Sequence, residues 1–177
     1  MTIAIFSTVI LVVYASLVMG GQSRKIALTS GREVEILDLR AGYDAGDAET
    51  LFISMGDAGL AAYRSMALVW DNIFPLVYTL VYISWFSILF GTLIPEQSVF
   101  RRINMLPLLA LLSDWLENTL VVNMIDSFTK NGRINNLLAS AASFSTIVKW
   151  MIAVLLVVIF VTGLIILLFR IAGRGRK

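Results

Sequence analysis

Two carboxyl groups and an amide lie in the middle of an apolar stretch that is about as long as a membrane-spanning helix. Asp114, Glu117 and Asn118 interrupt Met105–Ile125 at spacings that place all three side chains on one helix face. Each carboxyl at the centre of a bilayer costs roughly 2.5–3.5 kcal/mol on insertion scales. Groups of this kind bind a polar ligand, an ion or a proton, or they join helices through hydrogen bonds.

A second polar stripe, in another predicted span, is the expected packing partner of the helix face that carries Asp114, Glu117 and Asn118. Four residues in the segment Leu68–Leu93 recur at steps of three and four: Asp71, Pro75, Tyr78 and Tyr82. Tyrosine hydroxyls can donate hydrogen bonds to carboxylates, so we expect the two stripes to face each other. The predicted intramembrane cluster is Asp114, Glu117, Asn118, Tyr78, Tyr82 and Asp71. Lys149 is the nearby basic residue, and we expect its ammonium group to extend to the membrane interface.

Two absences narrow the chemistry. The chain contains no histidine and no cysteine, which excludes imidazole and thiolate metal ligands, Ser-His-Asp hydrolysis and disulfides within it. It has no glycine-rich phosphate loop, and its basic residues are dispersed, so we predict no cofactor, no metal and no nucleic acid partner. Any catalysis would use carboxyl, hydroxyl, amide and lysine groups.

The composition predicts the elements that position these groups. Of the 177 residues, 58% are hydrophobic and only 15% are charged, as expected of a polytopic membrane protein rather than a soluble domain. We predict an all-α protein with a bundle of four transmembrane helices. The expected spans are Thr2–Met19, Leu68–Leu93, Met105–Ile125 and Ile147–Phe169. In domain terms these are a first helix at 1–19, an extramembrane cap at 20–67, and a three-helix membrane region with a basic tail at 68–177.

The cap is predicted to combine a short hairpin with a helix. Lys25–Leu28 and Glu33–Leu39 flank a turn-like Thr-Ser-Gly-Arg sequence, and the second segment alternates in polarity. A helix should begin near Asp47, capped by Asp44 or Asp47, and a new helix should start at Gly56-Asp57.

Basic residues predict the orientation. The loop 94–104 carries Arg101 and Arg102, and the C-terminal tail carries further basic residues, whereas the long first loop is mixed in charge. The positive-inside rule therefore places both termini in the cytoplasm, matrix or stroma, and the first loop outside. The candidate lipid-headgroup residues are Arg170, Arg174, Arg176 and Lys177.

The chain also resembles small four-span membrane proteins of uncharacterised function. The residues that carry the resemblance are Tyr43, Gly56-Asp57-Ala58-Gly59, Tyr63, Asp71, Phe74-Pro75, Tyr78, Asp114 and Glu117-Asn118. The resemblance implies a membrane protein and no particular activity. In outline the architecture is similar to sterol-isomerase and sigma-2-type bundles, which enclose a lipophilic ligand beside buried carboxyls; this likeness is one of architecture, without matching motifs.

Three functions are compatible with these features. The first is a non-catalytic accessory subunit that associates with other membrane proteins. The second is a site for a lipid- or sterol-like ligand, with Asp114 or Glu117 as acid or base. The third is an ion or proton conduit, which is disfavoured because the Met105–Ile125 stretch has no polar residue before Ser113. We expect the first, with the ligand site as the alternative.

Overall fold

The computed structural model describes the backbone of residues 1–174 and the side chains of residues 1–173. All regular structure in this part of the chain is helical, as predicted. Four continuous helical segments there are long and apolar enough to cross a membrane, so the chain has the build of a multi-pass integral membrane protein. These segments are Thr2–Ser30, Ala45–Leu93, Val99–Asn131 and Asn136–Gly173.

The first three of these segments each combine several elements and include a π or 3₁₀ stretch, whereas the fourth is one uninterrupted helix. In chain order the elements are α1 (Thr2–Val13), η1 (Tyr14–Met19), α2 (Gly20–Ser30), η2 (Leu37–Leu39), α3 (Ala45–Ser65), η3 (Met66–Trp70), α4 (Asp71–Leu93), η4 (Val99–Met105), α5 (Leu106–Asn131) and α6 (Asn136–Arg174).

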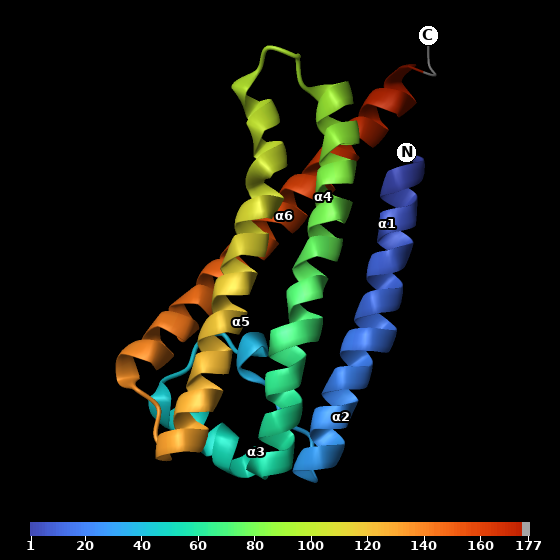
Figure 1. Ribbon diagram of the computed structural model, residues 1–177. Coiled ribbons are helices and arrows are strands. Elements are labelled where there is room, and N and C mark those ends of the chain that lie inside the picture. The colour runs from blue at the N-terminus through green and yellow to red at the C-terminus, as the bar shows by residue number, and fades with distance from the viewer. Residues whose placement is uncertain (175–177) are drawn as a thin grey trace.

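Helix α4 is central to the arrangement. It packs against α1 on one side and against α5 and α6 on the other (Figure 1). Helix α6 has 39 residues, or roughly 58 Å at 1.5 Å per residue, and it crosses α4 and α5 obliquely (Figure 1). Both described ends of the chain and the η4 loop lie at one end of the molecule, while α3 runs across the other end (Figure 1).

The predicted hairpin is wrong, because the first span continues as helix to Ser30. Extending an existing helix avoids the cost of nucleating a new element. The turn-like sequence instead ends this helix: Gly31 is left-handed, and Arg32 N–H donates to the carbonyl of Ala27 at 3.1 Å in a Schellman motif. Beyond it, Val34 and Ile36 are turned inward as their alternation predicts, but the segment has no partner strand among the described residues.

The helix signals of the first loop mark where α3 begins and where it bends. Asp44 caps α3 and forms a reciprocal capping box with Asp47: Asp47 N–H donates to Asp44 Oδ1 at 2.8 Å, and Asp44 N–H donates to Asp47 Oδ2 at 3.1 Å. At Gly56 the backbone leaves helical geometry with φ 63° and ψ 177°, which kinks α3. The kink allows the 49-residue segment Ala45–Leu93 to cross the end of the molecule before it enters the span.

Two apolar cores lie at different levels of the molecule. The first is formed by residues 36–37, α3 and the parts of α5 and α6 that lie nearest α3, around Phe52, Tyr63 and Met124. The second lies toward the η4 end, where Phe86 and Leu89 of α4 meet Leu156 of α6. The polar residues of α5 and α6 fall between these two cores.

Candidate functional site

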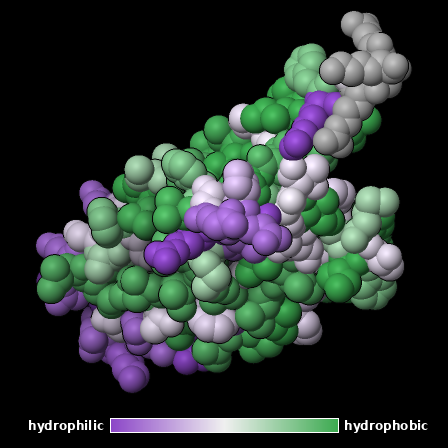
Figure 2. Space-filling view, turned by 90° about the horizontal axis from the view of Figure 1, so that it is seen from above, coloured by the Kyte–Doolittle hydropathy of each residue, from purple (hydrophilic) through white to green (hydrophobic). Residues whose placement is uncertain are grey.

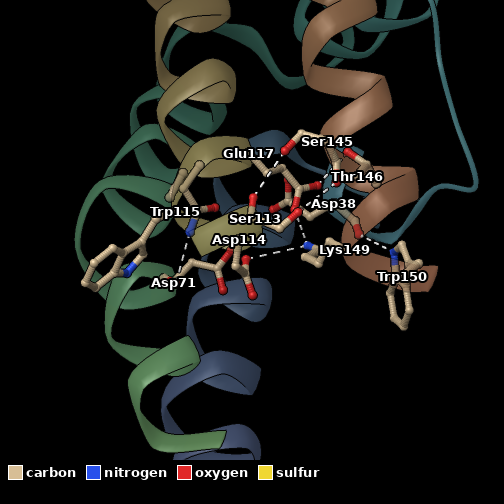
Figure 3. A network of polar contacts seen from close by, with 12 residues as sticks. Asp38, Asp71, Ser113, Asp114, Trp115, Glu117, Ser145, Thr146, Lys149 and Trp150 are labelled. Carbon is tan, nitrogen blue, oxygen red and sulfur yellow. Dashed lines mark hydrogen bonds and ion pairs between the residues drawn. The ribbon is translucent and has the colours of Figure 1, made fainter. Parts of the chain in front are cut away.

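An ion pair joins α5 to α6 inside the protein (Figure 3). The Lys149 ammonium contacts the Glu117 carboxylate at Oε2, and Thr146 Oγ1 donates to the other oxygen, Oε1, at 2.6 Å. Glu117 has no exposed surface, and the Lys149 side chain is only 13% exposed. Thr146 and Lys149 lie three residues apart on α6, so one face of that helix supplies both partners.

Asp114 joins the same network from one turn earlier on α5. Its Oδ1 lies 3.7 Å from Lys149 Nζ, and its Oδ2 accepts a 3.1 Å hydrogen bond from the hydroxyl of Tyr78 on α4. Asp114 is 4% exposed. Its carboxyl therefore connects all three central helices, with a cation on one side and a phenol on the other.

Asn118 is paired with a helix defect in α4. Pro75 has no N–H, so the carbonyl of Asp71, four residues earlier, loses its usual helical donor. The Asn118 side-chain amide donates to this carbonyl at 3.0 Å, within the protein interior. The neighbouring carbonyls also receive side-chain donors, from Tyr14 OH to Trp70 at 2.8 Å and from Trp115 Nε1 to Asn72 at 3.0 Å.

Asp38 enters the cluster from the loop between α2 and α3. Tyr63 OH donates to its Oδ1 at 3.2 Å. Trp150 Nε1 donates to its backbone carbonyl at 3.0 Å (Figure 3). Asp38 is buried. Burial raises the pKa of this carboxyl above its ordinary value, although nearby Lys149 and the Tyr63 hydrogen bond act in the opposite direction. These hydrogen bonds hold the loop between α2 and α3 against α6 at Trp150.

Small residues let α6 approach its neighbours closely. Ala139 and Ala142 are fully buried, and Ser143 Oγ accepts a 2.9 Å hydrogen bond from the backbone N–H of Tyr43. Ser113 and Ser145 each donate a hydroxyl to the other's backbone carbonyl, at 3.4 and 3.1 Å. These contacts bring the backbones of α5 and α6 together at the level of the ion pair.

Carboxyls outnumber ammonium groups in the cluster. Asp38, Asp71, Asp114 and Glu117 are all within electrostatic reach of Lys149. Among the described residues, the buried oxygens Asp38 Oδ2, Tyr43 OH and Asn118 Oδ1 accept or donate no hydrogen bond. No group of three or more acidic side chains in residues 1–174 has the arrangement of a metal site.

Two surface grooves lie near the cluster without reaching its carboxyls on α5. One groove lies beside Trp150 and the Leu39–Ala41 turn, and the other lies beside Phe100 and Leu109; neither is lined by Asp114 or Glu117. Along α5 the cluster is bounded by Ala110 on one side and Val121 on the other, each belonging to an apolar core. The polar groups therefore form an internal layer.

The structure separates the predicted residues into two sets. It brings Asp114, Glu117, Asn118, Tyr78 and Asp71 together. Tyr82 instead packs against Phe86, with ring centroids 5.7 Å apart and the rings tilted at 55°, and makes no hydrogen bond to the cluster among the described residues. Arg170 Nη1 donates to the carbonyl of Thr92 at 2.6 Å. The side chain of Arg174, with Arg176 and Lys177, lies outside the described residues.

The expectation for Lys149 is wrong. Its ammonium group pairs with two buried carboxylates instead of reaching the interface, because the carboxyls are nearer and are buried with it. Sequence reasoning also missed Thr146 and Asp38. Thr146 and Lys149 continue the buried Ala139–Ala142 face of α6 at helical spacing, and that periodicity was the available signal. Asp38 lies in a loop, where no periodicity indicates which side chain turns inward.

Comparison with protein-family models, with curated proteins and with solved structures finds no match for this chain.

Proposed function

We propose that this protein is a non-catalytic accessory subunit of a larger membrane assembly. The observation that carries the proposal is the closure of the Asp114–Glu117–Lys149 cluster between two apolar cores. A buried ion pair with further hydrogen bonds can specify how helices align, because any other alignment leaves a charge unpaired. On this reading the costly polar groups set the alignment of α4, α5 and α6, and association uses the outer surface.

The outer surface of α1 supports association. Large apolar residues are exposed over much of the circumference of α1 and η1, and five of them follow one another at alternating steps of three and four: Ile3, Phe6, Ile10, Val13 and Leu17. This is the spacing of a helix-packing seam. The opposite face is the one that meets α4, where Trp85 Nε1 donates to Thr8 Oγ1 at 3.0 Å. A helix from another subunit would fit along the exposed stripe.

The experiment is photo-crosslinking in native membranes, followed by purification in mild detergent. A benzoyl-phenylalanine replaces Phe6, which is exposed on α1, or Phe86, which is fully buried, as the matched control. The accessory role predicts a crosslinked polypeptide of one defined mass at Phe6 and only intramolecular products at Phe86. A chain that purifies alone, folded and carrying only lipid, would contradict it.

The alternative is a site for a lipid- or sterol-like ligand, which could act as an enzyme with a carboxyl as acid or base. It is favoured by the buried oxygens of Asp38, Tyr43 and Asn118 that lack partners among the described residues, since a ligand hydroxyl could occupy such a position. Here Asp114→Asn and Glu117→Gln should abolish retention of a specific lipophile. Unchanged stability and unchanged lipid retention in both variants would remove this alternative.

A further inference from the structure

A second feature lies on the side of the ion pair that faces the end of the molecule where the termini lie. An open groove of about 800 Å³ runs between the η4–α5 junction and α6. Its lining is almost entirely apolar, with Phe100, Ile103 and Leu106 on one side and Leu155 and Ile159 of α6 on the other. The one charged residue in the lining is Arg102.

Three arginines at this end differ in what they contact. Arg101 donates from Nε and Nη2 to the carbonyl of Ile94 at 3.3 and 3.0 Å, and Arg170 donates to that of Thr92. Arg102 is exposed and makes no hydrogen bond or ion pair with the residues that the structure describes. Its guanidinium therefore has donors to offer to a ligand in the groove.

The surroundings identify the kind of ligand. Seen from this end, hydrophilic side chains form a small patch bordered by hydrophobic ones (Figure 2). Val99, Phe100 and Met105 are exposed beside Arg102, as expected of residues that insert at a membrane interface. A guanidinium at that level meets lipid phosphates, which it binds with paired, charge-assisted hydrogen bonds.

We propose that the groove binds one anionic glycerophospholipid, with an acyl chain along Leu106, Leu155 and Ile159 and the phosphate on Arg102. Charge complementarity favours this occupant over a second copy of the chain, which would bring a like charge to the same place. The proposal is independent of the accessory role, because it concerns a different face of the protein.

Native mass spectrometry of the full-length chain in mild detergent tests the proposal. The probes are dioleoyl phosphatidylglycerol and dioleoyl phosphatidylcholine, which share acyl chains and differ in headgroup charge. We expect one phosphatidylglycerol retained per chain, in preference to phosphatidylcholine. A basic residue near an anionic headgroup contributes on the order of 1 kcal/mol, so Arg102→Gln should weaken retention about fivefold. Arg101→Gln, with the same charge change one residue away, should leave retention nearly unchanged.

A second pair of variants tests the groove itself. Leu109 and Leu112 of α5 are 55% and 56% exposed, and only Leu109 lines the groove. Leu109→Trp should fill the groove and expel the lipid, whereas Leu112→Trp should not. This pair of variants also tests lipid binding in the groove if the Arg102→Gln variant fails to fold. The proposal would be overturned if the protein retained both lipids equally. It would also be overturned if Arg102→Gln and Arg101→Gln, or Leu109→Trp and Leu112→Trp, had equal effects, or if the protein were a dimer that Leu109→Trp dissociates.

Discussion

The side-chain amide of Asn118 donates a 3.0 Å hydrogen bond to the backbone carbonyl of Asp71, the carbonyl that Pro75 leaves without its helical donor. In a membrane an unsatisfied carbonyl is costly, and neighbouring helices normally supply the missing partner. Asn118 thus completes the hydrogen bonding of α4 from α5. The proline and the amide, 43 residues apart in the sequence, form one structural unit.

This unit predicts strong coupling between positions 75 and 118. Asn118→Leu should destabilise the protein by about 1–3 kcal/mol, because the Asp71 carbonyl is then buried without a donor. In a Pro75→Ala background the same change should cost much less, since the backbone N–H that the alanine restores can bond that carbonyl. Unfolding free energies in mixed micelles of the four proteins measure the coupling. Additive effects would show that Asn118 acts elsewhere.

The buried ion pair should be far more sensitive to removal of one partner than an exposed one. Lys149→Met leaves Glu117 and Asp114 buried without their cation and should cost about 3–5 kcal/mol. Arg64→Ala is the control: Arg64 and Asp126 form a bidentate pair whose side chains are 41% and 38% exposed, so solvent screens the pair and its loss should destabilise the protein far less.

Adding Glu117→Gln to Lys149→Met should recover part of the loss, because a neutral amide replaces the unpaired carboxylate. Unfolding in mixed micelles again provides the measurement. Equal losses for Lys149→Met and Arg64→Ala would mean that water or lipid headgroups reach Lys149, contrary to the closed cluster.

Asp38 should make stability depend on pH. Because burial raises the pKa of its carboxyl in the folded protein, the folded state holds this proton over a window in which the unfolded state, with a pKa of about 3.9, has released it. Stability should therefore fall as pH rises through that window. The prediction is that Asp38→Asn matches wild type below the window and exceeds it above, in unfolding free energies measured against pH. Parallel curves for the two proteins would contradict it.

Gly56 should be the glycine whose backbone matters most in α3. Its φ of 63° disfavours any L side chain, although a Cβ there would meet no atom within 4 Å. Gly56→Ala should therefore cost about 1–3 kcal/mol through backbone strain alone. Gly91 of α4 also has open space around a Cβ, and its φ is ordinary, so Gly91→Ala should be neutral or stabilising by up to about 1 kcal/mol. Melting temperatures in detergent compare the two variants, and similar shifts would mean that α3 straightens without cost.

Local patterns predicted a large part of the fold. Apolar run lengths identified four spans, and Asp44 and Gly56 marked a helix start and a kink that the structure contains. Helical spacing placed Asp114, Glu117 and Asn118 on one face. The error over residues 25–28 arose from the same local reading, since a glycine that ends a helix and a glycine in a hairpin turn look alike in sequence until the preceding helix is known to continue.

The sequence by itself determined that this chain is a helical, four-span membrane protein with acids on one face of its third span, because hydropathy and helical periodicity are properties of neighbouring residues. Only the tertiary structure decided that Lys149 pairs with Glu117, that Asn118 bonds the carbonyl freed by Pro75, and that Asp38 turns inward. The first two of these contacts join residues that are 32 and 47 positions apart, and the third involves a residue in the loop between α2 and α3. They depend on the axial position and the rotation of each helix relative to its neighbours. Packing between the helices sets both quantities, and the sequence of one segment does not encode them.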